Sequence, residues 1–215
     1  KVIFDTDMYT DYDDAGALGL LHKLADEGWC EILATISCTR GNASVAACEI
    51  INRFCGRGDI PVGCAKAGPD RKDGAHFGTY GHLLKSYPNT FKYADSSQAP
   101  AALDVYRRVL SAQPDKSVTL CSVGFLNNVA ELLEQEPALF AQKIKVWYVM
   151  GCTPNGREYN IYCDVPAAKA AFAALEEIGY AGTFTVEMIP FSRLPDLVLP
   201  DQALAEKVVA EFKKM

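Results

Sequence analysis

The sequence lacks any apolar run that approaches the roughly 20 residues a membrane-spanning helix needs, so we predict no insertion in a membrane. Positive charge is also scarce, because 21 Lys and Arg stand against 27 Asp and Glu and leave a net charge of −6. A nucleic-acid binder usually shows the opposite balance. The composition therefore disfavours both a membrane and a nucleic acid as partners.

The eight cysteines form no C-x-x-C pair, and no group of Cys and His has the spacing of a zinc site. Several of them, such as Cys38 and Cys121, lie inside apolar runs. We therefore expect reduced, buried thiols, which favours a cytoplasmic location. The first residue is Lys1 rather than Met, so a removed leader, and with it secretion and disulfides, stays open as the alternative.

Neither an internal repeat nor a linker divides the 215 residues, and we predict a single domain over residues 1–215. Short apolar runs alternate with longer amphipathic ones. Strands are predicted over residues 1–4, 31–37, 60–63, 117–122, 144–150 and 183–188. Helices are predicted over residues 13–27, 43–54, 99–112, 126–136, 165–178 and 201–213.

This alternation predicts a three-layer, Rossmann-like α/β fold, in which helices cover both faces of a mostly parallel sheet. Ligands of such folds bind outside the carboxyl ends of the strands. The segments that follow Phe4, Ser37, Ser122 and Met150 are therefore the places where we expect a site. Residues 64–98 show no clear periodicity, and a loop of this length is usually functional or a lid.

Five carboxylates lie within ten residues at the end of the first strand, namely Asp5, Asp7, Asp11, Asp13 and Asp14. Charges in the first turn of a helix account for one or two of them. They do not account for the two that end a buried strand, where desolvation is costly. A hard cation such as Ca²⁺ or Mg²⁺ would offset their repulsion. The cluster therefore predicts a metal site.

Two enzyme families place Asp-x-Asp at the end of a strand. In the haloacid-dehalogenase-like phosphatases Asp5 would be the nucleophile and Asp7 the acid, but their Thr or Val two residues later is Tyr9 here. The nucleoside hydrolases instead follow Asp-x-Asp with Asp-Asp before an Ala-rich helix, as this chain does at Asp13 and Asp14. Tyr9 departs from the Gly that is usual there and would narrow the pocket or change its preference.

Further segments match the nucleoside hydrolases in order along the chain. They are Arg40-Gly41-Asn42, the run from Val123 to Asn128, Met150-Gly151, and Glu158-Tyr159-Asn160-Ile161 followed by Asp164. Each follows a predicted strand. The sequence therefore resembles the nucleoside hydrolase family, the inosine–uridine-preferring hydrolases and their relatives, from Val2 to about Phe191.

The resemblance implies calcium-dependent hydrolysis of the N-glycosidic bond of ribonucleosides, a reaction of nucleoside salvage that releases base and ribose. Asp7 would bind Ca²⁺ and act as the general base, and Asp14 would be a bidentate ligand. The main-chain carbonyl of Val123 would be a further ligand, and Asp5 would support the loop. The resemblance also implies a homodimer or homotetramer.

The resemblance implies sugar contacts as well. Asp13 would bind the ribose 2′-hydroxyl, Asn42, Glu158 and Asn160 would bind the other hydroxyls, and Met150 would line the pocket. His82 is the candidate acid that protonates the leaving base, although His76 in the same loop could take this role. Asp164 is interpreted as a helix N-cap.

One ligand of the family has no counterpart in this sequence. Family members carry a calcium-binding Asp in their last third, often after His or Trp, and neither pair occurs here. Asp196 and Asp201 follow the sixth predicted strand too closely to replace it. A nucleoside- or sugar-binding relic without turnover is therefore the alternative to an active hydrolase.

Overall fold

The computed structural model describes residues 1–8, 12–40, 42–69, 86–87, 98–151, 158–180 and 183–187. Within these ranges one sheet has six strands in the order β3-β2-β1-β4-β5-β6, and every neighbouring pair is parallel. The strands are β1 (Val2–Thr6), β2 (Ile32–Ser37), β3 (Val62–Cys64), β4 (Val118–Ser122), β5 (Ile144–Met150) and β6 (Thr183–Glu187).

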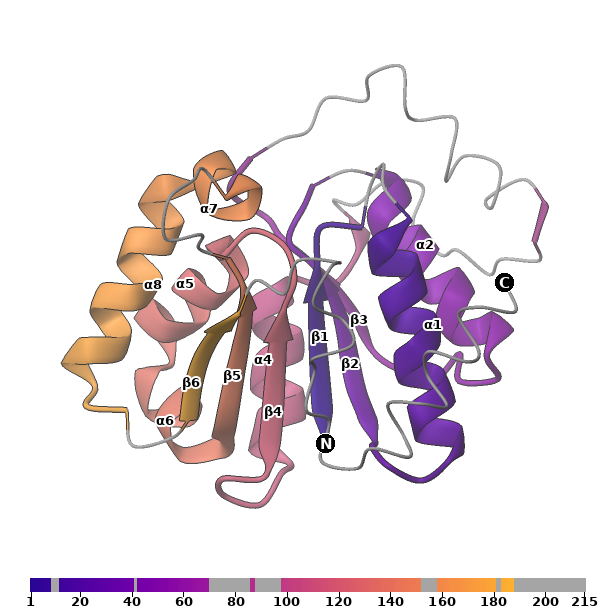
Figure 1. The fold of residues 1–215 in the computed structure, drawn as a ribbon, viewed down its shortest axis with the longest axis horizontal. Helices are drawn as coiled ribbons and strands as arrows, with labels where there is room; N and C mark the ends of the chain where they lie inside the picture. Colours follow the sequence, from indigo (N-terminus) through magenta and orange to yellow (C-terminus); the bar gives the residue numbers. More distant parts are fainter. Residues whose placement is uncertain are drawn as a thin grey trace.

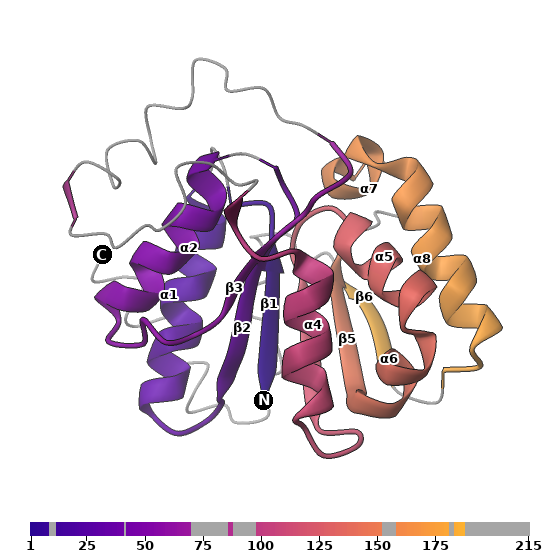
Figure 2. The same ribbon diagram turned by 180° about the vertical axis from the view of Figure 1, so that it is seen from behind.

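The helices of the described chain are α1 (Asp13–Asp26), α2 (Asn42–Phe54), α4 (Ala102–Ser111), α5 (Asn127–Gln135), α6 (Pro137–Lys143), α7 (Tyr159–Cys163) and α8 (Val165–Glu177). Figures 1 and 2 show α1 and α2 on one face of the sheet and α4, α5, α6 and α8 on the other. The predicted α/β fold with a parallel sheet and helices on both faces is confirmed. The predicted helix over 201–213 lies outside the described residues. None of the described helices has the length and apolar character to cross a membrane.

Alternating side chains of the strands separate two hydrophobic cores. Ile3 belongs to the larger core beneath α4, α5 and α8, which is centred on Trp147, whereas Phe4 belongs to the smaller core beneath α1 and α2. Phe140 packs edge-on against Trp147 with 5.7 Å between ring centroids. Burying these side chains on both faces stabilises the sheet and fixes its register.

The strand order has one topological switch point, between β1 and β4. From β1 the chain moves outward through β2 and β3, and it then returns to β4 and moves outward the other way. The connections leave β1 and β4 toward opposite faces, which opens a crevice at the carboxyl ends of these two strands. The fold thus places the predicted acidic segment at the edge where ligands bind.

All seven cysteines within the described ranges are free, in agreement with the reduced thiols predicted from the sequence, and Cys152 lies outside these ranges. Three of the seven, Cys38, Cys48 and Cys64, are buried. Burial raises the pKa of the Cys38 and Cys48 thiols, so both stay protonated and unreactive.

A buried polar network joins α1, α2 and β2. Asn52 donates to the Thr35 hydroxyl at 2.9 Å, and its oxygen lies 2.9 Å from Nε2 of His22. The His22 ring therefore donates from Nε2, which leaves Nδ1 as the acceptor 3.4 Å from the Arg57 guanidinium. Arg57 also bonds Asp26 at 2.6 Å. A second ring proton would thus point at a guanidinium.

We expect this network to make stability depend on pH. Burial lowers the pKa of His22 below its ordinary 6.5, so the unfolded chain takes up the proton before the folded chain does. The stabilisation is complete above about pH 6.5 and is lost as the pH falls below that value, by about 1.4 kcal/mol for each unit of pKa displacement. Urea unfolding of the protein and of His22→Gln between pH 5 and 7.5 measures this effect.

The His22→Gln variant should have a flatter pH dependence than the unchanged protein, because it removes the group that titrates. Equal slopes for the two proteins across this range would contradict the assignment of a neutral buried His22.

Candidate active site

Hydrogen bonds join the segments that leave β1, β2 and β4 at the switch point. The Val123 N–H donates to the carbonyl of Asp5 at 2.8 Å, and the Cys38 N–H donates to the carbonyl of Thr6 at 2.9 Å. Asn160 on α7 reaches the same place, where its amide donates to the carbonyl of Val123 at 3.0 Å. Four sequence segments predicted to converge thus meet at one edge of the sheet (Figure 1).

Asp5 is the last residue but one of β1. Its side chain faces α4 and α5 and is fully buried. Its carboxylate accepts hydrogen bonds from the Tyr106 hydroxyl at 2.5 Å and from the Asn128 amide at 3.1 Å. Burial raises the pKa of this carboxyl to about 7, the two hydrogen bonds oppose the shift, and the charge of Asp7 adds to it. The Asp5 carboxylate is thus bound by side chains of α4 and α5, and its predicted role is to support the loop.

Asp7 and Asp14 are two further buried carboxylates at this edge, with 8% and 7% of their surface exposed. The Thr6 hydroxyl donates to Oδ1 of Asp14 at 2.5 Å and accepts the N–H of Met8 at 3.1 Å. Thr6 therefore ties the first turn of α1 to the end of β1 beside Asp7. Asp13 begins α1 and is exposed.

The predicted sugar-binding residues of α7 have clear local roles. Glu158 is the N-cap of this helix, and its carboxylate accepts the N–H groups of Asn160 at 3.0 Å and Ile161 at 2.8 Å. Asn160 is buried, and its amide nitrogen donates to the carbonyls of Val123 and Met150. Met150 at the end of β5 is 37% exposed. Asp164 caps α8 through the N–H of Ala167, which confirms its interpretation as an N-cap.

Other predicted site residues lie partly or wholly outside the part of the chain that the structure describes. His76 and His82 lie outside the described residues, as does Asp11. Asn42 begins α2, so its backbone is at the carboxyl edge of β2. Among the described residues no group of three or more His, Cys, Asp or Glu side chains could hold a metal ion. The predicted ligand set of Asp7, Asp14 and the Val123 carbonyl therefore stays a prediction.

Gly124 leaves no room between the β4 segment and the acidic loop. A Cβ at this position would lie 2.5 Å from the Asp7 nitrogen and 2.6 Å from Sγ of Cys38. The Phe125 N–H donates to the same sulfur at 3.1 Å. A glycine is required here because only its missing side chain lets the two loops approach, and the approach fixes where the Asp7 backbone lies.

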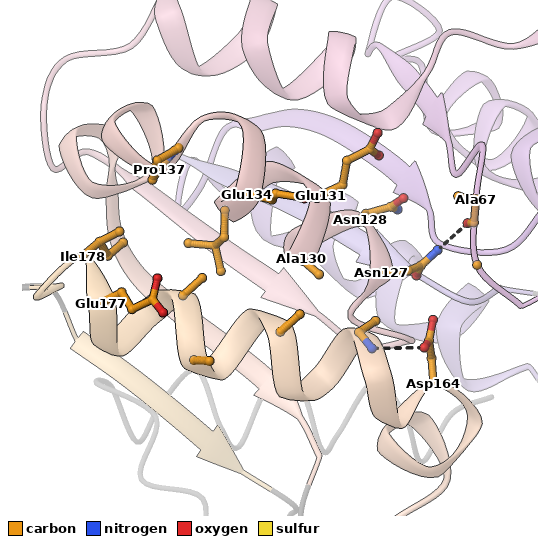
Figure 3. Close-up of a pocket in the computed structure, with 16 residues that line it drawn as sticks. Ala67, Asn127, Asn128, Ala130, Glu131, Glu134, Pro137, Asp164, Glu177 and Ile178 are labelled. Carbon is orange, nitrogen blue, oxygen red and sulfur yellow. Dashed lines mark hydrogen bonds between the residues drawn. The ribbon is translucent and has the colours of Figure 1, made fainter.

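A groove of about 810 Å³ lies between α5 and α8, and neither Asp7 nor Asp14 lines it (Figure 3). Alanines of α8 form much of its lining, and Glu131, Glu134 and Glu177 lie along it. At its carboxyl-edge end Asn127 donates to the carbonyls of Cys38 and Ala67, both at 3.0 Å. This groove does not contain the predicted site residues.

Sequence reasoning gave no role to three residues that build the site. Asn128 was part of a matched segment, but its contact with Asp5 depends on a residue 123 positions away. Tyr106 belongs to an amphipathic helix whose apolar face reads as core, and Cys38 reads as a buried apolar residue. No local signal distinguishes such residues from ordinary core.

An acidic edge at the switch point of a parallel sheet defines a Rossmann-like α/β protein with a candidate cation site. The family model of the inosine-uridine preferring nucleoside hydrolases matches residues 2–212, and the chain belongs to this family. This confirms the resemblance seen in the sequence, and the phosphatase interpretation gains no support. No curated protein matches the sequence.

Several solved structures share the fold. The effector protein XOO4466 has a TM-score of 0.67 at 15% identity, and the type III effector XopQ in complex with adenosine diphosphate ribose has 0.67 at 14%. The inosine-uridine preferring nucleoside hydrolase of Bacillus anthracis has 0.64 at 19%, over 99% of this chain and 71% of that one. The match covers 95% of this chain and 62% of each effector protein, so the chain spans less than two thirds of their length.

Gly124→Ala should destabilise the protein by about 1–3 kcal/mol, because overpacking forces the two loops apart. Urea unfolding measures the loss. The matched control is Gly16→Ala on α1, where a Cβ meets nothing within 4 Å. There, alanine should raise stability by about 0.5–1 kcal/mol, since it restricts the unfolded chain and favours the helix. Equal stability of Gly124→Ala and the unchanged protein would refute the close approach.

Proposed function

We propose that this chain hydrolyses the N-glycosidic bond of ribonucleosides with the help of calcium and releases base and ribose. The observation that carries the proposal is the pair of buried carboxylates, Asp7 and Asp14, beside Thr6 at the switch point. A nucleoside hydrolase family match over residues 2–212 gives this acidic edge its chemical context.

The donor set fits calcium in kind. Asp7, Asp14 and the carbonyl of Val123 would hold the ion, and all three offer the oxygen ligands that Ca²⁺ prefers. Burial is the main cause of the raised pKa of Asp5, and the negative charge of Asp7 adds to it; a cation would relieve this repulsion. When bound, Ca²⁺ would supply a Lewis acid that lowers the pKa of a water molecule and orients the ribose diol.

Proton transfer in this proposal depends on Asp7 and His82. Asp7 would take the proton from the attacking water, which must reach the anomeric carbon as an oxocarbenium-like transition state develops. His82 would give a proton to the leaving base. Asp7 is positioned for its role by the contact of its backbone with Gly124. A general base of this kind contributes about 100- to 10,000-fold to the rate.

Sugar binding would use atoms that the local structure leaves available. The Asn160 nitrogen is engaged by two carbonyls, so its side-chain oxygen would accept from a ribose hydroxyl. Two backbone N–H groups orient the Glu158 carboxylate, and its other lone pairs would accept further hydroxyls. Asp13 would bind the 2′-hydroxyl, Asn42 would add a contact from the start of α2, and Met150 would line the pocket.

The second candidate is a ribosyl-binding protein without turnover. It is favoured by the small number of carboxylate ligands among the described side chains, since Ca²⁺ takes six to eight oxygens. One structural relative was solved with adenosine diphosphate ribose, so this molecule belongs in the substrate panel with inosine, uridine and guanosine. Under this candidate calcium and the sugar bind but no reducing sugar is released.

We expect Asp7→Asn to lower kcat for nucleoside hydrolysis by about 100-fold or more, because the general base is lost. Asp14→Asn should also abolish turnover at micromolar calcium, since a buried carboxylate ligand is replaced by a neutral amide. Release of reducing sugar from inosine, uridine and guanosine measures both, and release of adenine is followed for adenosine diphosphate ribose, which is already a reducing sugar. Asp59→Asn is the control, because this exposed carboxylate precedes β3 at the opposite edge of the sheet.

Removal of calcium tests the metal separately. A chelator should stop sugar release by the unchanged protein, and added Ca²⁺ should restore it. Turnover that persists in the chelator, or in both Asp7→Asn and Asp14→Asn, would sink the assignment of these residues. Bound but unhydrolysed nucleoside would decide for the second candidate.

A further inference from the structure

A single buried carboxylate connects four elements directly beneath the candidate active site. Asp5 of β1 accepts from Tyr106 of α4 at 2.5 Å and from Asn128 of α5 at 3.1 Å. The Asn128 amide also donates to the carbonyl of Ser37, the last residue of β2, at 3.1 Å. Asp5, Tyr106 and Asn128 are each at most 1% exposed, so no solvent competes for these bonds.

Burying a carboxylate costs free energy that a purely structural contact would not require. Burying a carboxylate requires hydrogen bonds that an apolar side chain would not need, and well-packed apolar groups are often at least as stable. Neighbouring strand positions that face the same core, such as Ile3, are apolar. The polar cluster therefore indicates a role in positioning the end of β1, because hydrogen bonds fix the orientation of a side chain more specifically than apolar packing does.

The position of Asp7 depends closely on the position of the end of β1. One residue, Thr6, separates Asp5 from Asp7, and its hydroxyl bonds Asp14. On the other side, Gly124 lies against the Asp7 nitrogen, so a shift of Asp5 cannot be absorbed there. A displacement of the Asp5 carboxylate would move Asp7 and the Thr6 contact to Asp14 together.

We propose that Tyr106 and Asn128 are positioning residues of the active site, which act on Asp7 and Asp14 through the buried carboxylate of Asp5. The catalytic consequence rests on the proposed nucleoside hydrolysis, whereas the structural consequence does not. Neither residue is among those proposed to bind the ion or the substrate. Their hydrogen bonds hold the end of β1 so that the carboxylates of Asp7 and Asp14 keep their orientation.

Three amides report on the strand end in the experiment. The N–H groups of Val123 and Cys38 donate to the carbonyls of Asp5 and Thr6, and the N–H of Met8 donates to the Thr6 hydroxyl. Hydrogen exchange, followed by mass spectrometry of peptides that contain these amides, is compared for the unchanged protein, Tyr106→Phe and Asn128→Ala. Two variants are used so that one remains if the other fails to fold.

The matched control is Thr35→Val, which removes a buried hydrogen bond of 2.9 Å from Asn52 elsewhere on β2. All variants are first compared by urea unfolding at pH 7.5. If Tyr106 and Asn128 are positioning residues, their variants exchange the three amides faster than Thr35→Val does at equal global stability. Exchange no faster than in Thr35→Val would overturn the proposal.

Turnover of inosine with Ca²⁺ gives the catalytic readout. We expect Tyr106→Phe and Asn128→Ala to lower kcat about 10- to 100-fold, because a small displacement of Asp7 and Asp14 lowers the rate steeply, with a smaller change in KM. Thr35→Val should keep the kcat of the unchanged protein. An unchanged kcat in both positioning variants would contradict the proposal. If the unchanged protein releases no ribose, nucleoside hydrolysis fails, and the exchange experiment alone decides whether these residues position the strand end.

Discussion

The burial of several carboxylates at one edge of the sheet is the constraint on which the candidate site depends. Hydrogen bonds from Tyr106 and Asn128 offset part of the desolvation of the Asp5 carboxylate, and burial nevertheless raises its pKa to about 7. Asp7 and Asp14 are buried at the same edge. The strand end therefore holds Asp5 on the side of α4 and α5 and places Asp14 against Thr6, and the proposed cation would lie beside Asp7 and Asp14.

The topology explains why this acidic edge lies where it does. Strands are added to the sheet in one direction from β1 and in the other direction from β4. The crevice therefore forms at the carboxyl ends of these two strands, and the segments after β2 and β5 border it. Gly124 brings the β4 segment against Asp7, and Asn160 brings α7 against Val123. Each contact uses a residue whose size or polarity the position requires, which is how a common α/β framework holds a particular chemistry.

Much of this arrangement could be predicted from the sequence, since period-2 and period-3.6 patterns identify strands and helices, and Asp-x-Asp at a strand end identifies the edge. The short helices α6 and α7 were missed because seven and five residues carry little periodicity. The cap formed by Glu158 and the tie from Tyr106 to Asp5 were also missed. The latter joins residues 101 positions apart, and that proximity exists only in the folded chain.

The central claim is that Asp7 and Asp14 are kept buried for a cation, and calorimetric titration of Ca²⁺ into the protein tests it most directly. The account predicts saturable binding of one ion per chain, abolished in Asp14→Asn and unchanged in Asp59→Asn. Absence of binding to folded protein, or equal binding by Asp14→Asn, would contradict it.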